Sequence, residues 1–167
     1  MAITAAQVKA LRDETSAGVM ECKRALEETG GDADAARDLL RQWGLARAAT
    51  KVGREVLHGL VESYIHAGGR IGVLLELNCE TDFVARTEEF RGLAHDLAMQ
   101  VAATNPRFVR RDELSAEQQG EAAELCLLAQ PYIRDTGRPV EDVVREAMAR
   151  FGENVEVRRF VRFELGA

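Results

Sequence analysis

At 167 residues the chain has room for one domain of ordinary size, or for a small module joined to a larger body. Its content of 46% hydrophobic and 30% charged residues is typical of a folded globular protein rather than a disordered one. The net charge of −6 argues against nucleic acid or an anionic membrane as a main partner, because both attract basic surfaces.

Targeting segments and the number of cysteines indicate the cellular compartment in which a protein works. No apolar run is long enough to span a membrane, and residues 1–6 lack the basic and apolar regions of a signal peptide. Cys22, Cys79 and Cys126 are widely spaced and form no CxxC pair. An odd number of separated cysteines is typical of reduced thiols in the cytosol. The sequence therefore predicts a cytoplasmic protein.

Residues 1–44 contain three short stretches with apolar residues at helical spacing. Residues 15–18 (TSAG) interrupt the first stretch, residues 30–32 (GGD) interrupt the second, and Gly44 is expected to end the third. Three helices of this length make a very small core, so we expect a semi-independent N-terminal module over 1–44. Residues 45–56 are alanine-rich and basic, which predicts a helical linker, most simply a solvated spacer.

From residue 57 the apolar period changes from helical spacing to alternation. Two alternating runs, 57–65 and 70–79, flank a glycine-containing turn at 67–69, which predicts a β-hairpin. Residues 87–104 return to helical spacing, and their apolar side would cover one face of that hairpin.

The second half of the body is predicted to contain two helices and a strand. A capping-box pattern at Ser115 predicts a helix over 115–129, and Pro139 suits the first position of a helix that ends at Gly152. A last strand is expected over about 154–164. Its apolar residues fall on one face by alternation: Val155, Val157, Val161 and Phe163. Residues 57–167 thus read as an α+β core, an antiparallel sheet with helices on one side.

The sequence offers little for covalent catalysis. It has no glycine-rich phosphate loop and no nucleophile elbow. The three histidines lack metal-ligand spacing, and surface or packing roles are favoured for them: His58, His66 and His95. Cys79 lies beside Glu80 and Asp82, but neighbouring carboxylates raise a thiol pKa and so oppose a nucleophilic role. We expect no cofactor and no bound metal.

Residues 78–86 join the predicted hairpin to the predicted helix, and Phe83 lies in the middle of this junction. In one interpretation Phe83 is buried under the following helix as part of the core. In the other it is an exposed apolar anchor for a partner, with Asp82 as its polar neighbour. Periodicity alone favours neither interpretation.

Three motifs carry a family resemblance. Residues 77–86 (LNCETDFVAR) closely resemble the signature of bacterial translation elongation factor Ts. Residues 11–26 (LRDETSAGVMECKRAL) resemble the N-terminal motif of that family, which lies in a three-helix module of the ubiquitin-associated type. Residues 151–163 (FGENVEVRRFVRF) resemble its C-terminal motif. The matches span nearly the whole chain in the family's order.

The chain departs from the family pattern in two places. Ser16 stands where the family usually has glycine, which a position with positive φ would prefer. The segment between Pro106 and Gln130 is shorter than in many members, and a helical hairpin and the second core copy of longer members are missing.

The resemblance implies a guanine-nucleotide exchange factor for elongation factor Tu that performs no covalent chemistry. Phe83 would wedge between two helices of the partner and displace the Mg²⁺ that holds GDP. The residues implied at this contact are Thr81, Asp82, Phe83 and Val84.

The resemblance also bears on other contacts and on assembly. It implies that the N-terminal module contacts elongation factor Tu through the candidate residues Gly18, Val19 and Met20. No direct contact with nucleic acid or membrane is implied. Because the chain has one core copy, a homodimer could supply the missing one. The alternative to exchange activity is a non-catalytic adaptor, whose module of the ubiquitin-associated type would bind peptides.

Overall fold

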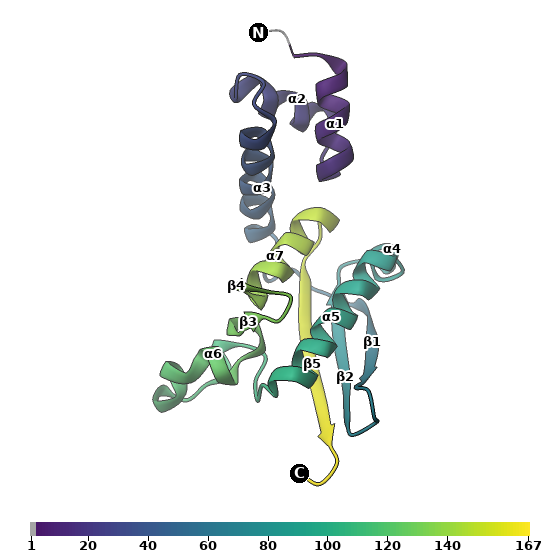
Figure 1. Ribbon diagram of the computed structural model, residues 1–167, viewed down its shortest axis with the longest axis vertical. Helices are drawn as coiled ribbons and strands as arrows, with labels where there is room; N and C mark the ends of the chain where they lie inside the picture. Colours follow the sequence, from purple (N-terminus) through teal and green to yellow (C-terminus); the bar gives the residue numbers. More distant parts are fainter. Residues whose placement is uncertain (1–2) are drawn as a thin grey trace.

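The computed structural model describes residues 3–167 and has an elongated shape (Figure 1). Its N-terminal end consists of α1 (Ala5–Thr15), α2 (Val19–Glu28) and α3 (Ala33–Ala49). The body then follows in chain order as β1 (His58–Ile65), β2 (Ile71–Cys79), α4 (Asp82–Ala85), α5 (Glu88–Thr104), α6 (Ala122–Leu125), β3 (Pro131–Tyr132), β4 (Asp135–Pro139), α7 (Val140–Phe151) and β5 (Val155–Glu164). Short 3₁₀ turns, η1 (Arg111–Glu113), η2 (Ala116–Glu121) and η3 (Leu127–Ala129), flank α6. Within residues 3–167, no helix is long and apolar enough to cross a membrane.

The three predicted N-terminal helices are confirmed, and they enclose a small core of their own. Their buried side chains are Val8, Leu11, Cys22, Ala25, Leu26, Ala36 and Leu40. Asp32 caps α3 by accepting the backbone N–H groups of Asp34 and Ala35, each at 3.0 Å. Ser16 ends α1 in the left-handed conformation, with φ at 56°, at the position where glycine is usual in the family.

The prediction that the third helix ends at Gly44 is wrong. Helix α3 continues to Ala49, and its lower end lies against α7 (Figure 1). Gly44 is buried there, and a Cβ atom at this position would lie 3.1 Å from the Cβ atom of Ala149. Ala48 is buried in the core of the body, while its neighbours Arg47 and Ala49 are exposed. The glycine thus permits a close helix contact and does not end the helix.

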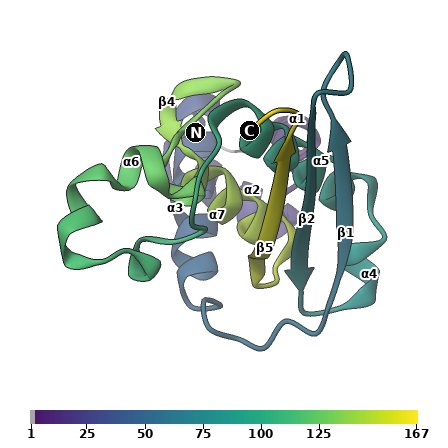
Figure 2. The same cartoon turned by 90° about the horizontal axis from the view of Figure 1, so that it is seen from below.

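The body is an antiparallel sheet with helices on one side, as the sequence predicted. The strand order is β1-β2-β5, with β2 in the centre (Figure 2). Alternate residues of β2 are buried under the helices: Val73, Leu75, Leu77 and Cys79. They share one core with the buried side of α5, which includes Phe90, Leu97 and Val101. The division of the chain into 1–44, 45–56 and 57–167 as separate units stays a prediction.

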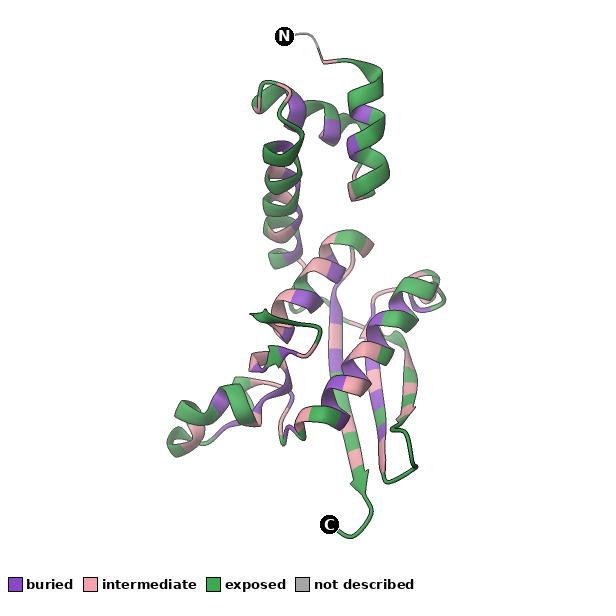
Figure 3. Cartoon of the chain, viewed as in Figure 1, coloured by how far each residue is buried: buried purple, intermediate pink, exposed green. Residues whose placement is uncertain are grey.

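A β-bulge overturns the predicted face of the last strand. Glu76 pairs with Arg159 and Leu77 pairs with Val157, so Arg158 is an extra residue in β5. One extra residue moves all following side chains to the opposite face. Val155 and Val157 are therefore buried, whereas Val161 and Phe163 are exposed and Val161 lies beside the outward-facing Leu74. Figure 3 shows the same change along β5, which is buried near α7 and exposed toward the C-terminus.

This outer face of the sheet carries exposed apolar side chains that we call the outer patch: Val61, Ile65, Leu74, Val161 and Phe163. The pairing makes the patch continuous, because Leu74 lies opposite Val161 and Gly72 lies between Ile65 and Phe163. A Cβ atom at Gly72 would lie 3.0 Å from the side chain of Ile65, so Ile65 extends over this position. Contiguous exposed apolar surface of this kind usually marks an interaction site.

The segment between α5 and α7 differs from its prediction. No continuous helix spans 115–129, because Cys126 is extended and its neighbours bond to Phe108. The N–H of Leu127 donates to the carbonyl of Phe108 at 2.9 Å, which breaks the helix into α6 and short 3₁₀ turns. The polar β3–β4 hairpin has no counterpart among the elements predicted from the sequence. Pro139 precedes α7 as its N-cap and is not its first helical residue.

Replacing Gly44 by leucine should lower the free energy of unfolding by about 1–3 kcal/mol, because the new side chain overpacks the contact between α3 and α7. Gly92→Leu is the matched control, because Gly92 is exposed on α5 with open space around it. That control should gain roughly 0.5–1 kcal/mol from helix propensity. Chemical denaturation would measure both changes, and equal stability of the two variants would contradict the close contact.

Candidate partner-binding site

Phe83 is exposed, which decides between its two interpretations. Its side chain is 82% exposed, more than any other large hydrophobic residue among those described. It projects from the first turn of α4, directly after the strand–helix junction. The core interpretation is therefore wrong, and the side chain is free to contact a partner. An exposed aromatic on a fixed base is typical of binding anchors.

Helix α4 is a single turn that local contacts hold in place. Thr81 is its N-cap, and the hydroxyl of Thr81 accepts the backbone N–H of Val84 at 3.5 Å. Asp82 occupies the first turn, where a negative charge is favourable, and forms an ion pair with Arg86 at 2.8 Å. Ala85 is buried and Val84 is half-buried against the core. These contacts hold one side of the turn down while Phe83 points outward.

Glu153 connects this turn to the other end of the fold. It lies in the loop between α7 and β5, and one carboxylate oxygen accepts the backbone N–H groups of Glu80 and Thr81 at 3.1 and 3.0 Å. The other oxygen accepts the hydroxyl of Thr81 at 2.5 Å. Bonds to an ionised acceptor are stronger than neutral ones. The junction before Phe83 is thus fixed by a residue more than seventy positions away.

A reciprocal set of bonds joins the same two loops. The carboxylate of Glu80 accepts the backbone N–H of Asn154 at 2.6 Å and lies 3.6 Å from the guanidinium of Arg54. The buried side chain of Asn154 donates to the carbonyl of Arg54 at 2.8 Å. Sequence reasoning assigned no role to Glu153 or Asn154. Their position in the C-terminal family motif could have indicated a role, since Glu80 lies in the family motif at residues 77–86.

Cys79 is a structural residue and not a nucleophile. It is buried, and its thiol donates to the carbonyl of Thr81 at 3.1 Å. Burial, reinforced by the carboxylate of Glu153, raises the pKa of the Cys79 thiol to about 11. The thiol therefore stays protonated at neutral pH. Among the described residues, no group of histidine, cysteine and carboxylate side chains could hold a metal ion.

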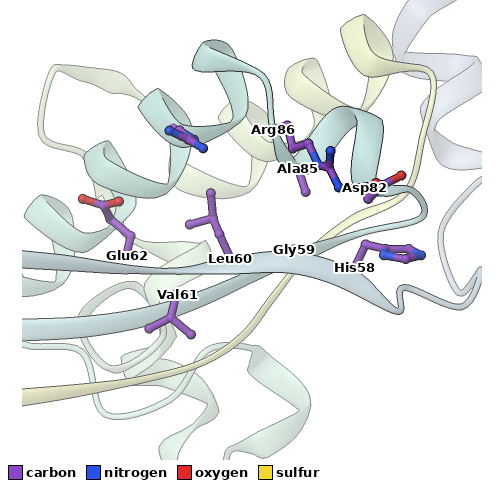
Figure 4. Close-up of a pocket in the computed structure, with 9 residues that line it drawn as sticks. His58, Gly59, Leu60, Val61, Glu62, Asp82, Ala85 and Arg86 are labelled. Atoms are coloured by element: carbon purple, nitrogen blue, oxygen red, sulfur yellow. Dashed lines mark ion pairs between the residues drawn. The ribbon is translucent and has the colours of Figure 1, made fainter.

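A cleft of about 520 Å³ lies beside α4, against the edge strand β1 (Figure 4). Leu60 and Glu62 point toward the helices, whereas Val61 points to the opposite face of the sheet. Asp82 and Arg86 form the charged wall of the cleft on the side of α4. The exposed Phe83 thus lies next to charged side chains, a common composition of protein–protein interfaces.

The residues expected at the contact of the N-terminal module lie on α2, apart from α4 (Figure 1). Gly18 is the N-cap of α2, and its N–H donates to the carboxylate of Glu21 at 3.4 Å. Val19 and Met20 follow in the first turn and are both exposed. The structure therefore places the predicted residues in two separate exposed regions, one at Val19 and Met20 and one at Phe83.

Comparison with known proteins gives one consistent result. The sequence profile of the family "Elongation factor TS" matches residues 44–124. An elongation factor Ts of Desulforamulus reducens is 50% identical over 98% of this chain and 89% of its own length. One from Thermodesulfovibrio yellowstonii is 48% identical over 99% of this chain and 98% of its own length.

The same alignments show that this chain lacks internal residues. The alignment with the Desulforamulus protein extends over 194 positions, more than the 167 residues of the chain. This excess agrees with a shortened internal segment. Full-length identity near one half, together with the profile match, establishes the relationship. The chain therefore belongs to the elongation factor Ts family, the nucleotide exchange factors of elongation factor Tu in translation.

Proposed function

We propose that this chain promotes GDP release from elongation factor Tu by inserting Phe83 between two helices of the partner's nucleotide-binding domain. The observation that carries the proposal is the exposed Phe83 on a junction held by Thr81 and Glu153. The resulting shift displaces the Mg²⁺ that bridges GDP to the partner. Loss of a divalent ion removes the largest local charge beside the phosphates, so GDP dissociates faster.

The residues around Phe83 have supporting roles in this proposal. Thr81 holds the start of α4, and Val84 packs the same turn onto the core. Asp82 is aligned by Arg86 and offers a carboxylate at the rim of the contact. In this proposal the chain supplies no covalent chemistry. It works in the cytoplasm and needs neither nucleic acid nor membrane.

The burial of one phenylalanine sets the scale of what Phe83 alone can contribute. Burial of its side chain contributes roughly 1.5–3 kcal/mol. A tenfold change in rate takes about 1.4 kcal/mol, so this side chain accounts for about one to two decades of acceleration. The remaining binding free energy comes from other contacts. Val19 and Met20 on α2 are suitable, because both are exposed apolar side chains.

The adaptor alternative, with a peptide-binding module and a passive body, is not favoured. It gives no role to the exposed Phe83 or to the bonds that fix its junction. Membership of the family also favours nucleotide exchange over the adaptor role. The part of the chain that matches the family profile includes the junction that carries Phe83.

Phe83→Ala should slow stimulated GDP release by about ten- to a hundredfold while the fold stays intact, because an exposed side chain contributes little to stability. Stopped-flow fluorescence of labelled GDP on elongation factor Tu measures the rate. Val52→Ala is the matched control, since Val52 is also exposed but lies outside the junction. A normal rate for Phe83→Ala would exclude the wedge.

Met20→Ala should act on affinity rather than on the maximal rate. Removal of an exposed interface side chain typically costs about 1 kcal/mol or more when it is a binding anchor. The concentration of this protein that gives half-maximal release should therefore rise roughly fivefold or more. The rate at saturation should match that of the unmodified chain. Unchanged half-maximal concentration would remove α2 from the interface.

The outer patch supports a second part of the proposal, a homodimer that pairs two sheets face to face. The proposed occupant is a second copy, because residues 3–167 form one three-stranded sheet with an exposed apolar outer face, and a two-fold axis would set the same patch of both copies against each other. This arrangement would cover Leu74, Val161 and Phe163 on both copies.

Light scattering should give the mass of a dimer for the unmodified chain and of a monomer for Phe163→Asp. The substitution places a charge in an interface that must be dry. Phe83→Ala should remain dimeric, because Phe83 lies outside the outer patch. A monomeric mass for the unmodified chain at micromolar concentration would contradict the homodimer.

A further inference from the structure

We propose that Glu153 is a positioning residue for nucleotide exchange: it orients α4, sets the direction in which Phe83 projects, and so controls the maximal rate of GDP release. The inference rests on the proposed role of Phe83. Glu153 itself belongs to the loop after α7, and it acts through Thr81 without touching the partner.

Both carboxylate oxygens of Glu153 accept hydrogen bonds. Oε2 accepts two backbone N–H groups, from Glu80 and Thr81, and Oε1 accepts the hydroxyl of Thr81. An ionised carboxylate is acceptor-only at both atoms, whereas an amide carries an NH₂ group on one side. A glutamine at this position would keep the volume but remove the charge, so the two N–H groups would lose their ionised acceptor. Its NH₂ group could meet Thr81 only if the hydroxyl turned round and accepted instead of donating, which changes the cap of α4.

Thr81 transmits the position of Glu153 to the helix. Its hydroxyl donates to Glu153 and accepts the N–H of Val84, so a single oxygen joins the carboxylate to the first turn of α4. Helix α4 has only four residues, too few to be stable through its own hydrogen bonds. Its direction therefore depends on the cap and on packing of Ala85. A shift of the cap would redirect Phe83, and reaction rates are sensitive to displacements of about 1 Å.

Other contacts keep the loops together when Glu153 is altered. Glu80 still accepts the N–H of Asn154, and Asn154 still donates to the carbonyl of Arg54. The buried side chains of the sheet and helices do not include Glu153. Substitution at Glu153 should thus loosen the direction of α4 without unfolding the body.

The test compares Glu153→Gln with the unmodified chain in stimulated GDP release, measured at several concentrations of the exchange factor. The maximal rate should fall at least threefold, while the half-maximal concentration changes less than twofold. Glu55→Gln is the control, because it removes an exposed carboxylate outside these loops. A purely structural role would lower the melting temperature and leave the maximal rate of the folded fraction unchanged.

A double variant makes the test specific to Phe83. In the Phe83→Ala background, Glu153→Gln should cause no further loss, because the positioned side chain is already absent. An equal loss in both backgrounds, or a normal rate for Glu153→Gln, would overturn the assignment while leaving the wedge intact. A normal rate for Phe83→Ala would instead overturn the proposed function, and the positioning role with it.

Substitutions at Thr81 keep the proposal testable if Glu153→Gln does not fold. Thr81→Ser retains the hydroxyl and should lose less of the maximal rate than Thr81→Val. Thr81→Val removes the hydroxyl's bond to Glu153 and the bond from Val84, keeps the backbone N–H bond to Glu153, and should reproduce the loss expected for Glu153→Gln. Equal maximal rates for the two variants would contradict transmission through Thr81.

Discussion

The carboxylate of Glu153 accepts three hydrogen bonds at the place where β2 turns into α4, and the presentation of Phe83 depends on this contact. A turn of four residues has no direction of its own, because it lacks the length for a stable helix. The direction of α4 is set by hydrogen bonds to Glu153, which lies in a loop that is distant in sequence. An exposed aromatic can then serve as an anchor, because little conformational freedom is lost when a partner covers it.

Helix α7 links the two exposed apolar sites. One side of α7 receives α3, where Gly44 allows close approach to Ala149 and Arg41 pairs with Glu146 at 2.7 Å. The end of the same helix leads into the loop that carries Glu153. Helix α7 thus contacts α3 of the N-terminal module, which carries Val19 and Met20, and through the loop of Glu153 it also contacts the junction that carries Phe83. A partner that contacts both sites meets them at a defined separation, which keeps the entropy lost on binding low.

Local sequence patterns predicted the elements with regular apolar spacing, and they failed where the deciding contact is long-range. The spacing of apolar residues predicted the hairpin, α5 and α7 correctly. The bulge at Arg158 is not visible in the alternation of apolar and polar residues, so the predicted face of Phe163 is wrong. Gly44 suits a helix end and a close helix contact equally well. Exposure of Phe83 was undecided by periodicity, and the family resemblance supplied its role. The bonds of Glu153 join residues that no local pattern connects.

The central claim is that Phe83 accelerates GDP release by displacing Mg²⁺ in elongation factor Tu. The most direct measurement is the acceleration of GDP release by this protein, compared at millimolar Mg²⁺ and in excess chelator. Because removal of the ion already does what the wedge is proposed to do, the acceleration should be large with Mg²⁺ and should shrink strongly without it. An equal acceleration under both conditions would contradict the account.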